Sequence, residues 1–231
     1  MLRFVRQLPL ALADWFFPRL CAGCERPLTL DERQLCPTCL ADLARTGYAN
    51  QPTANELYRR VAALAPVTQA AAGFHFEAES RLQHIVHTLK YSYRPALGVY
   101  LGALLAHELG PGLAQGAQAL VPVPLYPRRL AQRGYNQAER LASGMAQVWR
   151  LPVLPHAARR LRPTGTQTGL SRSARFENME GAFAAALPPG LHTLVVVDDV
   201  ATTGATLLAV LLALERAGAT DLRVVTLGVA T

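Results

Sequence analysis

Short apolar runs alternate along this chain with segments whose apolar positions recur every three or four residues. The runs at 67–76, 119–123, 194–197 and 222–229 are rich in small and β-branched aliphatic residues. Continuous runs of this kind are typical of strands that are buried on both faces of a parallel sheet. We therefore expect an α/β domain, with a mostly parallel sheet and flanking helices.

The helical segments carry recognisable start signals. Ser80 with Gln83, and Asn136 with Glu139, have the spacing of residues that cap the first turn of a helix. A further helix is expected over residues 204–217, directly after the third apolar run. Residues 127–129, Pro-Arg-Arg, indicate a basic turn, and residues 161–180 have no periodicity and indicate a long functional loop, often a lid.

Composition shifts divide the chain into three parts. Residues 1–45 predict an N-terminal helix followed by a cysteine-rich module, and residues 46–57 are polar and indicate a linker. Residues 58–231 hold the alternating strand and helix patterns. The apolar stretch at residues 8–17 is interrupted by proline and aspartate. It is therefore too short and too broken for a signal peptide or a membrane span. We expect a cytoplasmic protein.

The cysteines form two C-x-x-C pairs separated by eleven residues: Cys21, Cys24, Cys36 and Cys39. Four thiolates with this spacing suit tetrahedral zinc, and four protein ligands leave no open position for catalysis. Two disulfides are disfavoured in a reducing cytoplasm. An iron–sulfur cluster has the same ligand type, but nothing else in the sequence indicates electron transfer. We therefore expect a structural zinc ion.

Positive charge is concentrated in one part of the chain. The net charge is +7, and residues 121–175 alone hold ten arginines against one acid. A local excess of this kind favours a site for pyrophosphate or a nucleic-acid backbone, whereas a solubility device would be spread more evenly. Lys90 is the only lysine among 23 basic residues. Its compact charge suits phosphate, although a single lysine can also survive by chance.

Two acids, Asp198 and Asp199, follow the third apolar run, at the sheet edge where open α/β folds bind ligands. The turn after them consists of small and hydroxyl-bearing residues: Thr202, Thr203, Gly204, Ala205 and Thr206. Backbone N–H groups at a helix N-terminus bind phosphate, and carboxylates bind a sugar diol. The alternative is a strand-to-helix turn in which these residues only cap the helix. The combination favours a sugar phosphate as ligand.

This segment resembles the 5-phosphoribosyl-1-diphosphate (PRPP) motif of type I phosphoribosyltransferases. The resemblance implies that Asp198 and Asp199 hold the ribose hydroxyls and that residues 202–206 hold the 5′-phosphate. It also implies a reaction at C1 of ribose that releases pyrophosphate, with magnesium bridging substrate oxygens.

Further segments extend the resemblance over nearly the whole chain. Residues 89–91, 121–125, 133–138 and 167–178, together with the cysteine pairs, are similar to the ComF family, especially the ComFC-type competence proteins. This resemblance implies a type I phosphoribosyltransferase-like domain carrying an N-terminal zinc finger. It also implies a role in natural transformation or the use of external DNA, with single-stranded DNA as a ligand and a competence helicase as a possible partner.

The resemblance suggests roles for residues outside the acid pair. Val123 and Pro124 would belong to a pyrophosphate loop with Arg133 close behind it. Gln167, Ser171 and Arg172 would belong to the lid, with Arg172 acting in catalysis together with Asp198 and Asp199.

Nucleic-acid contacts are expected from five arginines: Arg128, Arg129, Arg159, Arg160 and Arg162. Tyr126 and Tyr135 could stack bases, although for Tyr135 a packing role before its helix is favoured. Two other functions remain open, a salvage enzyme for a nucleobase and a non-catalytic PRPP sensor that binds DNA. The sequence leaves open the acceptor of the phosphoribosyl group, whether turnover occurs, the oligomeric state, and whether DNA contact is direct.

Overall fold

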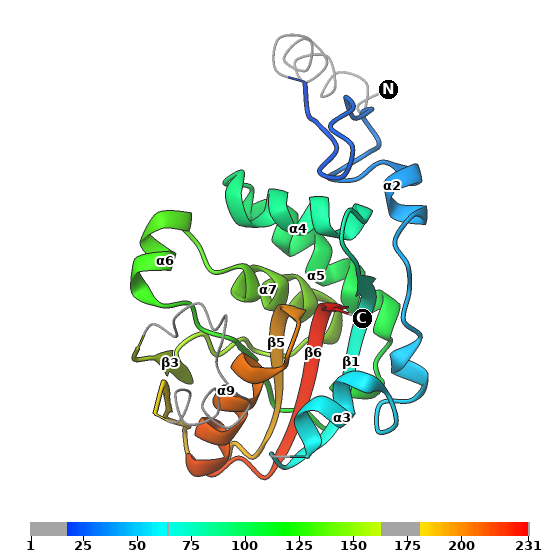
Figure 1. Ribbon diagram of the computed structural model, residues 1–231. Helices are drawn as coiled ribbons and strands as arrows, with labels where there is room; N and C mark the ends of the chain where they lie inside the picture. The colour runs from blue at the N-terminus through cyan, green and yellow to red at the C-terminus, as the bar shows by residue number, and fades with distance from the viewer. Residues whose placement is uncertain (1–17, 64, 163–180, 231) are drawn as a thin grey trace, which may run out of the picture.

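A four-stranded sheet lies at the centre of the computed structural model, which describes residues 18–63, 65–162 and 181–230. The strands run in the order β1-β6-β5-β2, and every neighbouring pair is parallel. Figure 1 shows β1, β6 and β5 side by side. They are β1 (Val67–Phe76), β2 (Ala119–Pro122), β5 (Thr193–Ala201) and β6 (Asp221–Ala230). The predicted α/β class is confirmed, and the carboxyl ends of the strands meet at the upper edge of the sheet in Figure 1.

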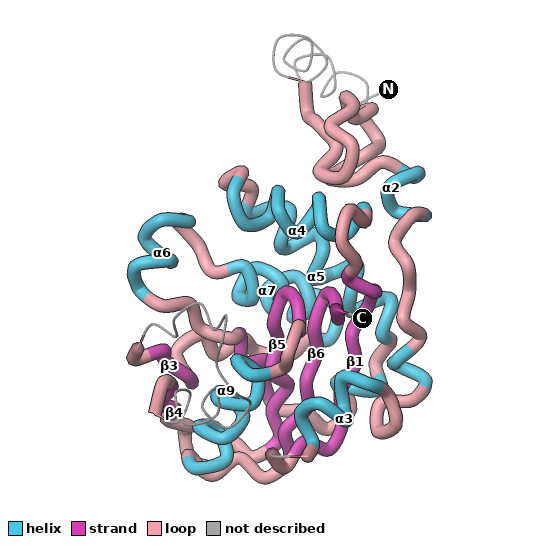
Figure 2. The backbone as a smooth tube through the Cα atoms, in the orientation of Figure 1, coloured by secondary structure: helices cyan, strands magenta, loops and turns pink. Residues whose placement is uncertain are grey.

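Helices cover both faces of this sheet (Figure 2). Helices α5 (Pro95–Leu109) and α7 (Gln137–Trp149) pack on one face, and α3 (Glu56–Ala62) and α9 (Ala205–Arg216) pack on the other. Side chains alternate between the two resulting cores along β5, because successive residues of a strand point to opposite faces. Val196 lies in the core beneath α3 and α9, whereas Val195 and Val197 lie in the core beneath α5 and α7. This double burial explains the continuous apolar run.

Two glycines allow α5 and α7 to touch through their backbones. A side chain at Gly102 would collide with the carbonyl of Leu141, and one at Gly144 would collide with the carbonyl of Val99. This close approach fixes α7 relative to the sheet. The first turn of α7 therefore lies beside the carboxyl end of β2, close to the predicted ligand site.

The remaining elements are short, apart from α4. They are α2 (Pro37–Ala41), η1 (Tyr48–Asn50), α4 (Arg81–Tyr91), η2 (Gly112–Ala114), α6 (Pro127–Arg133), β3 (Ala158–Arg160) and β4 (Phe183–Ala185). Strands β3 and β4 form a separate antiparallel pair. This pair brackets the predicted lid.

Two sequence predictions of local structure are wrong in detail. Strand β5 runs past the acid pair to Ala201, because β6 continues to pair with it as far as Val229. The basic turn predicted at residues 127–129 is the beginning of helix α6. Pro127 fits the first turn of that helix, where no backbone N–H is required, and Gly134 ends it in a left-handed conformation with φ of 75°.

The segment predicted as a linker lies along the outer edge of β1. His75 N donates to Ala44 O at 2.8 Å, Thr46 N donates to Gly73 O at 3.1 Å, and Ala70 N donates to Pro52 O at 2.8 Å. These bonds cover an edge that would otherwise present unpaired backbone groups. The boundaries at residues 45 and 57 stay a prediction.

Some predicted features fall outside the described residues. The N-terminal helix was predicted within residues 1–17, and most of the predicted lid lies within residues 163–180. Across the described ranges, every helix is too short or too polar to cross a bilayer.

Candidate functional site

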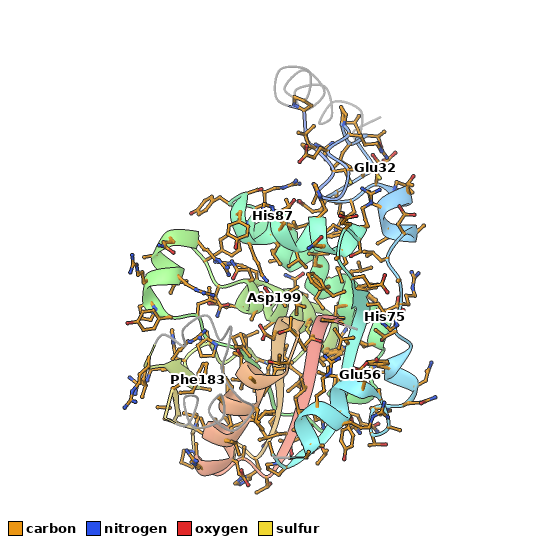
Figure 3. All side chains as sticks on the ribbon, in the orientation of Figure 1. Glu32, Glu56, His75, His87, Phe183 and Asp199 are labelled. Atoms are coloured by element: carbon orange, nitrogen blue, oxygen red, sulfur yellow. The ribbon has the colours of Figure 1, made fainter. Side chains whose placement is uncertain are left out.

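The acid pair occupies the carboxyl end of β5, in the middle of the sheet (Figure 3). Asp198 Oδ1 accepts a hydrogen bond from Asp199 N at 2.9 Å, and Asp199 Oδ1 accepts one from Val200 N at 2.7 Å. Each carboxylate therefore uses one oxygen locally and keeps the other for further contacts. Both side chains are only partly exposed.

Lys90 makes the ion pair of this site. It lies in the last turn of α4, and its Nζ is 2.9 Å from Asp199 Oδ2. Both side chains are mostly buried, with 24% and 14% of their surfaces exposed. The only lysine of the chain is thus placed against the second acid of the predicted PRPP motif, a pairing that the sequence pattern did not predict.

Asp198 has an unusual electrostatic environment. Burial and the adjacent Asp199 carboxylate raise its pKa to about 8, and Lys90 and Arg160 oppose this rise. Arg160, on β3, lies with its Cζ 5.4 Å from the centroid of the Phe183 ring. Burial and the neighbouring Arg129 lower the pKa of Arg160, while Asp198 raises it. Arg160 therefore belongs to the surroundings of the acid pair, whereas Arg159 and Arg162 are exposed.

The predicted phosphate turn follows β5 directly. Thr202 and Thr203 are exposed, and Gly204 has φ of 78°, a left-handed conformation that favours glycine. Ala205 N donates to Thr203 Oγ1 at 3.4 Å, and α9 begins at Ala205 with its first N–H groups directed toward the turn. Thr206 lies in the first turn of this helix, half-buried. The geometry suits a phosphate at a helix N-terminus.

Arg60, which the sequence did not indicate, holds this turn from the neighbouring helix α3. Its guanidinium donates to the carbonyl of Thr202 and, at 2.7 Å, to the carbonyl of Ala230, and it pairs with Glu56. Gly204 also lies against the side chains of α3. Because 142 residues separate Arg60 from Thr202, no spacing in the sequence could have revealed this contact.

The predicted pyrophosphate loop, residues 121–125, lies beside the acid pair. Val123 N donates to Val197 O at 2.9 Å, which places the loop next to the residue preceding Asp198. Asn136 caps α7 by accepting from Ala138 N, and its Nδ2 donates to Val123 O at 3.0 Å. Val123 and Pro124 are both buried, and neither has a free backbone donor, because Val123 N already donates to Val197 O and proline has no N–H.

Arginines of α6 stand next to this loop. Arg128 and Arg129 are exposed, and Arg133 donates to Gln137 Oε1 at 2.9 Å. A cavity of about 450 Å³ opens between α6 and the end of α4. Its lining residues are Lys90, Tyr91, Tyr93, Arg129, Gln132 and Arg133.

The two tyrosines named from the sequence lie outside this cavity. Tyr135 is buried, and its hydroxyl donates to the carbonyl of Leu89, which supports the packing role and leaves its ring inaccessible to bases. Tyr126 is half-buried and does not line the cavity. The exposed tyrosines are instead Tyr91 and Tyr93.

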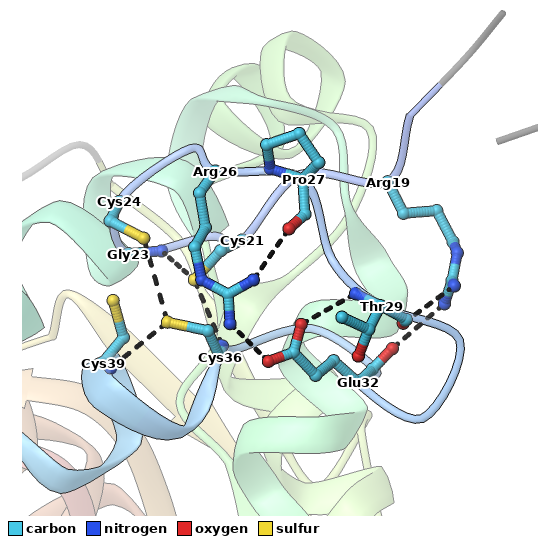
Figure 4. A network of polar contacts seen from close by, with 10 residues as sticks. All are labelled: Arg19, Cys21, Gly23, Cys24, Arg26, Pro27, Thr29, Glu32, Cys36 and Cys39. Atoms are coloured by element: carbon cyan, nitrogen blue, oxygen red, sulfur yellow. Dashed lines mark hydrogen bonds and ion pairs between the residues drawn. The ribbon is translucent and has the colours of Figure 1, made fainter. Parts of the chain in front are cut away.

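The four cysteines come together in the N-terminal module (Figure 4). Their sulfur atoms all lie within 4.8 Å of one another, and the Cys24 and Cys36 sulfurs are 3.8 Å apart. Sulfurs bound to tetrahedral zinc at about 2.3 Å have a mutual separation of about 3.8 Å. Gly23 N and Cys36 N both donate to Cys21 Sγ, at 3.4 and 3.3 Å, as backbone groups do around a thiolate. The cluster could hold a metal ion.

This module is attached to α4 and to the turn after it. Arg81 donates to Gly23 O at 2.8 Å, and Thr88 donates to Ala22 O at 3.2 Å. Arg94 donates to Leu20 O at 3.0 Å and to Gln34 Oε1 at 2.8 Å. The cysteine module therefore supports the helix that delivers Lys90 to the acid pair. Three predicted lid residues lie outside the described residues: Gln167, Ser171 and Arg172.

Comparison with known proteins agrees with this site. A model of the phosphoribosyl transferase domain matches residues 133–228, a span that contains the acid pair and the phosphate turn. A solved structure, glutamine phosphoribosylpyrophosphate (PRPP) amidotransferase from B. subtilis complexed with ADP and GMP, is a distant likeness. It has a TM-score of 0.38 and 20% identity, and the match covers 60% of this chain and 30% of that chain.

Relatives match the chain over a greater length. DNA utilization protein YhgH of Escherichia coli (strain K12) is 32% identical over 222 residues, which covers 94% of this chain and 92% of the relative. The protein of the same name from Salmonella typhimurium is 31% identical over 229 residues, with the same coverage. Competence protein F of Haemophilus influenzae is 36% identical over 110 residues, 46% of this chain and 48% of that protein. The chain belongs to the ComF-type family that includes these proteins.

Proposed function

We propose that this protein binds PRPP with magnesium at the end of β5 and acts in the uptake or use of external DNA. The observation that carries the first part is the placement of Asp198 and Asp199 beside a helix N-terminus and a lysine. Carboxylates for a diol, N–H groups for a phosphate and a compact cation for a second phosphate are the groups that a phosphorylated ribose requires.

Each part of PRPP has a matching group on the chain. Asp198 and Asp199 take the ribose hydroxyls, and residues 202–206 take the 5′-phosphate. Val123 and Pro124 shape the loop beside the pyrophosphate, and nearby cations such as Arg133 contact its oxygens. Magnesium suits the hard carboxylate oxygens and the substrate phosphates, and when bound it neutralises charge on the pyrophosphate. Gln167, Ser171 and Arg172 complete the site as lid residues.

The role in DNA metabolism rests on the relatives and on the charge of the surface. Proteins named for DNA utilization match nearly the whole chain, and a protein named for competence matches half of it. Arg128, Arg129, Arg159 and Arg162 are exposed, and Arg129 lines a cavity together with Lys90, so these arginines suit the backbone of single-stranded DNA. A helicase or another DNA-processing protein is the expected partner, and the cytoplasm the expected compartment.

Zinc is the metal that best suits the cysteine cluster. The set consists only of sulfur ligands, the sulfur separation is that of a tetrahedral zinc site, and the cluster is mostly buried. Four protein ligands make this zinc structural. It stabilises the module that supports α4.

Calorimetric titration of magnesium–PRPP tests the proposal. The double variant Asp198→Asn, Asp199→Asn removes both carboxylates while keeping side-chain shape, and we expect it to abolish the binding seen with the wild type. The matched control is Asp31→Asn, Glu215→Gln, which replaces two exposed acids by amides, one in the cysteine module and one in the last turn of α9. A folded, zinc-loaded wild type that fails to bind magnesium–PRPP would overturn the proposal.

The acceptor decides between a transferase and a non-catalytic sensor. Once binding is established, release of pyrophosphate from PRPP is measured with free nucleobases and with single-stranded DNA as acceptors. Release only with a free nucleobase identifies a salvage enzyme. Tight PRPP binding without pyrophosphate release in either case identifies a sensor.

A further inference from the structure

The cavity between α4 and α6 has a composition unlike that of a simple anion site. We call it the tyrosine cleft, lined by Lys90, Tyr91, Tyr93, Arg129, Gln132 and Arg133. Three of these residues are cationic, none is acidic, and two are aromatic. Tyr91 and Tyr93 are 65% and 71% exposed, which is unusual for large aromatic side chains on a surface without a partner.

Tyr93 is held in a strained backbone conformation. Its φ is 47°, in the left-handed region that a bulky residue rarely adopts. The next residue, Arg94, is fastened to the cysteine module by two hydrogen bonds, and the ring of Tyr93 lies against Gly134, where any side chain would collide with it. Arg94 and Gly134 thus hold the exposed ring of Tyr93 in place. Backbone strain of this kind is typical of ligand sites.

The ring of Tyr91 lies against the side chains of Arg133 and His87. The Arg133 guanidinium lies over its ring at 5.5 Å from the centroid, and the His87 ring lies 4.7 Å from it. Arginine planes and aromatic rings are the surfaces on which unpaired bases stack. Arg133 is itself oriented by Gln137, so this stack is positioned before any ligand arrives.

The positive charge of the cleft suits the phosphate backbone of a nucleic acid. Within the described part of the chain, the Arg129 guanidinium makes no hydrogen bond or ion pair with another side chain, so it is available to a ligand. Lys90, in contrast, is paired with Asp199 and connects the cleft to the acid pair. A ligand in the cleft therefore lies next to the predicted ribose site.

We propose that the tyrosine cleft binds a base of a single-stranded nucleic acid, with Tyr93 as the stacking surface and Arg129 as a contact to the flanking phosphate. A duplex does not fit this role, because its bases are already stacked and their faces are covered. The inference rests on the proposed function, since it names the place where the DNA of that proposal meets the PRPP site.

Fluorescence titration with a single-stranded oligothymidylate that carries one 2-aminopurine tests this inference. Loss of a stacking contact costs about 1–3 kcal/mol per base, so Tyr93→Leu is expected to lower the affinity about fivefold or more and to reduce quenching of 2-aminopurine. Tyr93→Phe keeps the aromatic face and is expected to bind as the wild type does. Tyr58→Leu, on α3 at the other face of the sheet, is the matched control.

An oligonucleotide of the same length with abasic positions separates base contacts from phosphate contacts. We expect Tyr93→Leu to bind the abasic oligonucleotide as the wild type does. Arg129→Gln, in contrast, is expected to weaken binding of both the abasic and the base-containing oligonucleotide, and to lower by about one the slope of log affinity against log salt concentration. Zinc content and thermal unfolding confirm that each variant is folded. Equal affinity of folded Tyr93→Leu and wild type for the base-containing strand would overturn the inference.

Parallel titration of the wild type with magnesium–PRPP distinguishes this failure from failure of the proposed function. Unchanged DNA binding by Tyr93→Leu, in a protein that binds PRPP, rejects the cleft alone. A Tyr93 effect in a protein that does not bind PRPP rejects the PRPP site and leaves the cleft standing.

Discussion

Lys90 Nζ lies 2.9 Å from Asp199 Oδ2, so the last turn of α4 is joined by an ion pair to the carboxyl end of β5. Both groups are mostly removed from water, and removing one partner leaves a poorly solvated charge. The pair holds the acid in place without a ligand. If Asp199 binds the ribose diol as proposed, the diol would compete with Lys90 for this carboxylate, and the Lys90 ammonium would become available to a phosphate.

A double-mutant cycle measures this coupling. We expect Lys90→Met and Asp199→Asn each to lower the free energy of unfolding, and the double variant to lose less than the sum. Residues in one ion pair couple by about 0.5–3 kcal/mol. Urea unfolding of the four proteins gives the coupling energy, and additivity within about 0.3 kcal/mol would contradict a structural pair.

The raised pKa of Asp198 predicts that the free energy of unfolding falls as pH rises. Its raised pKa in the folded state means that the folded protein holds a proton there which the unfolded chain releases near its ordinary pKa of about 3.9. Stability from this group is therefore complete below that value and is lost as pH rises toward about 8. In Asp198→Asn this loss is absent.

The measurement is the difference in free energy of unfolding between Asp198→Asn and the wild type, from pH 6 to pH 9. We expect the difference to grow in favour of the variant up to about pH 8 and then to level off. The zinc-loaded form is used throughout, so that protonation of the cysteines does not contribute. A difference that is constant with pH would show that Asp198 titrates normally.

Arg60 is expected to position the phosphate turn. Arg60→Ala removes the contacts to the carbonyls of Thr202 and Ala230, so the turn loses its support from α3. We expect about tenfold weaker binding of ribose 5-phosphate, because this change in affinity corresponds to the free energy of a hydrogen bond made by a charged group. Calorimetry with ribose 5-phosphate reports the phosphate subsite without the pyrophosphate.

Arg59→Ala is the control for this variant. Arg59 is the neighbouring residue of α3, and it donates to Ala54 O without contacting the turn. The same affinity loss in Arg59→Ala would mean that α3 as a whole, or its charge, is responsible.

Metal removal is expected to act on both the cysteine module and the ligand site. We expect about one zinc ion per chain, and we expect Cys39→Ser to lose it with a lower melting temperature, since four-cysteine zinc sites contribute directly to folding. Because the module is bonded to α4, we also expect the proposed DNA binding at the tyrosine cleft to weaken. Elemental analysis and thermal unfolding check the first part, and fluorescence titration checks the second.

The sequence determined those features that are local along the chain. The strand at residues 67–76, the acid pair followed by the turn at 202–206, and the spacing of the four cysteines are each encoded within a few consecutive residues. Helix α5 was not identified, because it is apolar around most of its circumference and therefore lacks a clear amphipathic period. Its packing against α7 on one side and the sheet on the other explains that composition.

Only the tertiary structure decided which distant residues meet. The pairing of Lys90 with Asp199, the contact of Arg60 with Thr202, and the presentation of Tyr93 beside Arg133 all join elements that are far apart in the chain. Such contacts depend on how helices pack across the sheet, and no periodicity or spacing carries that information. The sequence thus determined the backbone and side-chain chemistry at one strand end, and the packing of α3, α4 and α6 decided which residues surround that strand end.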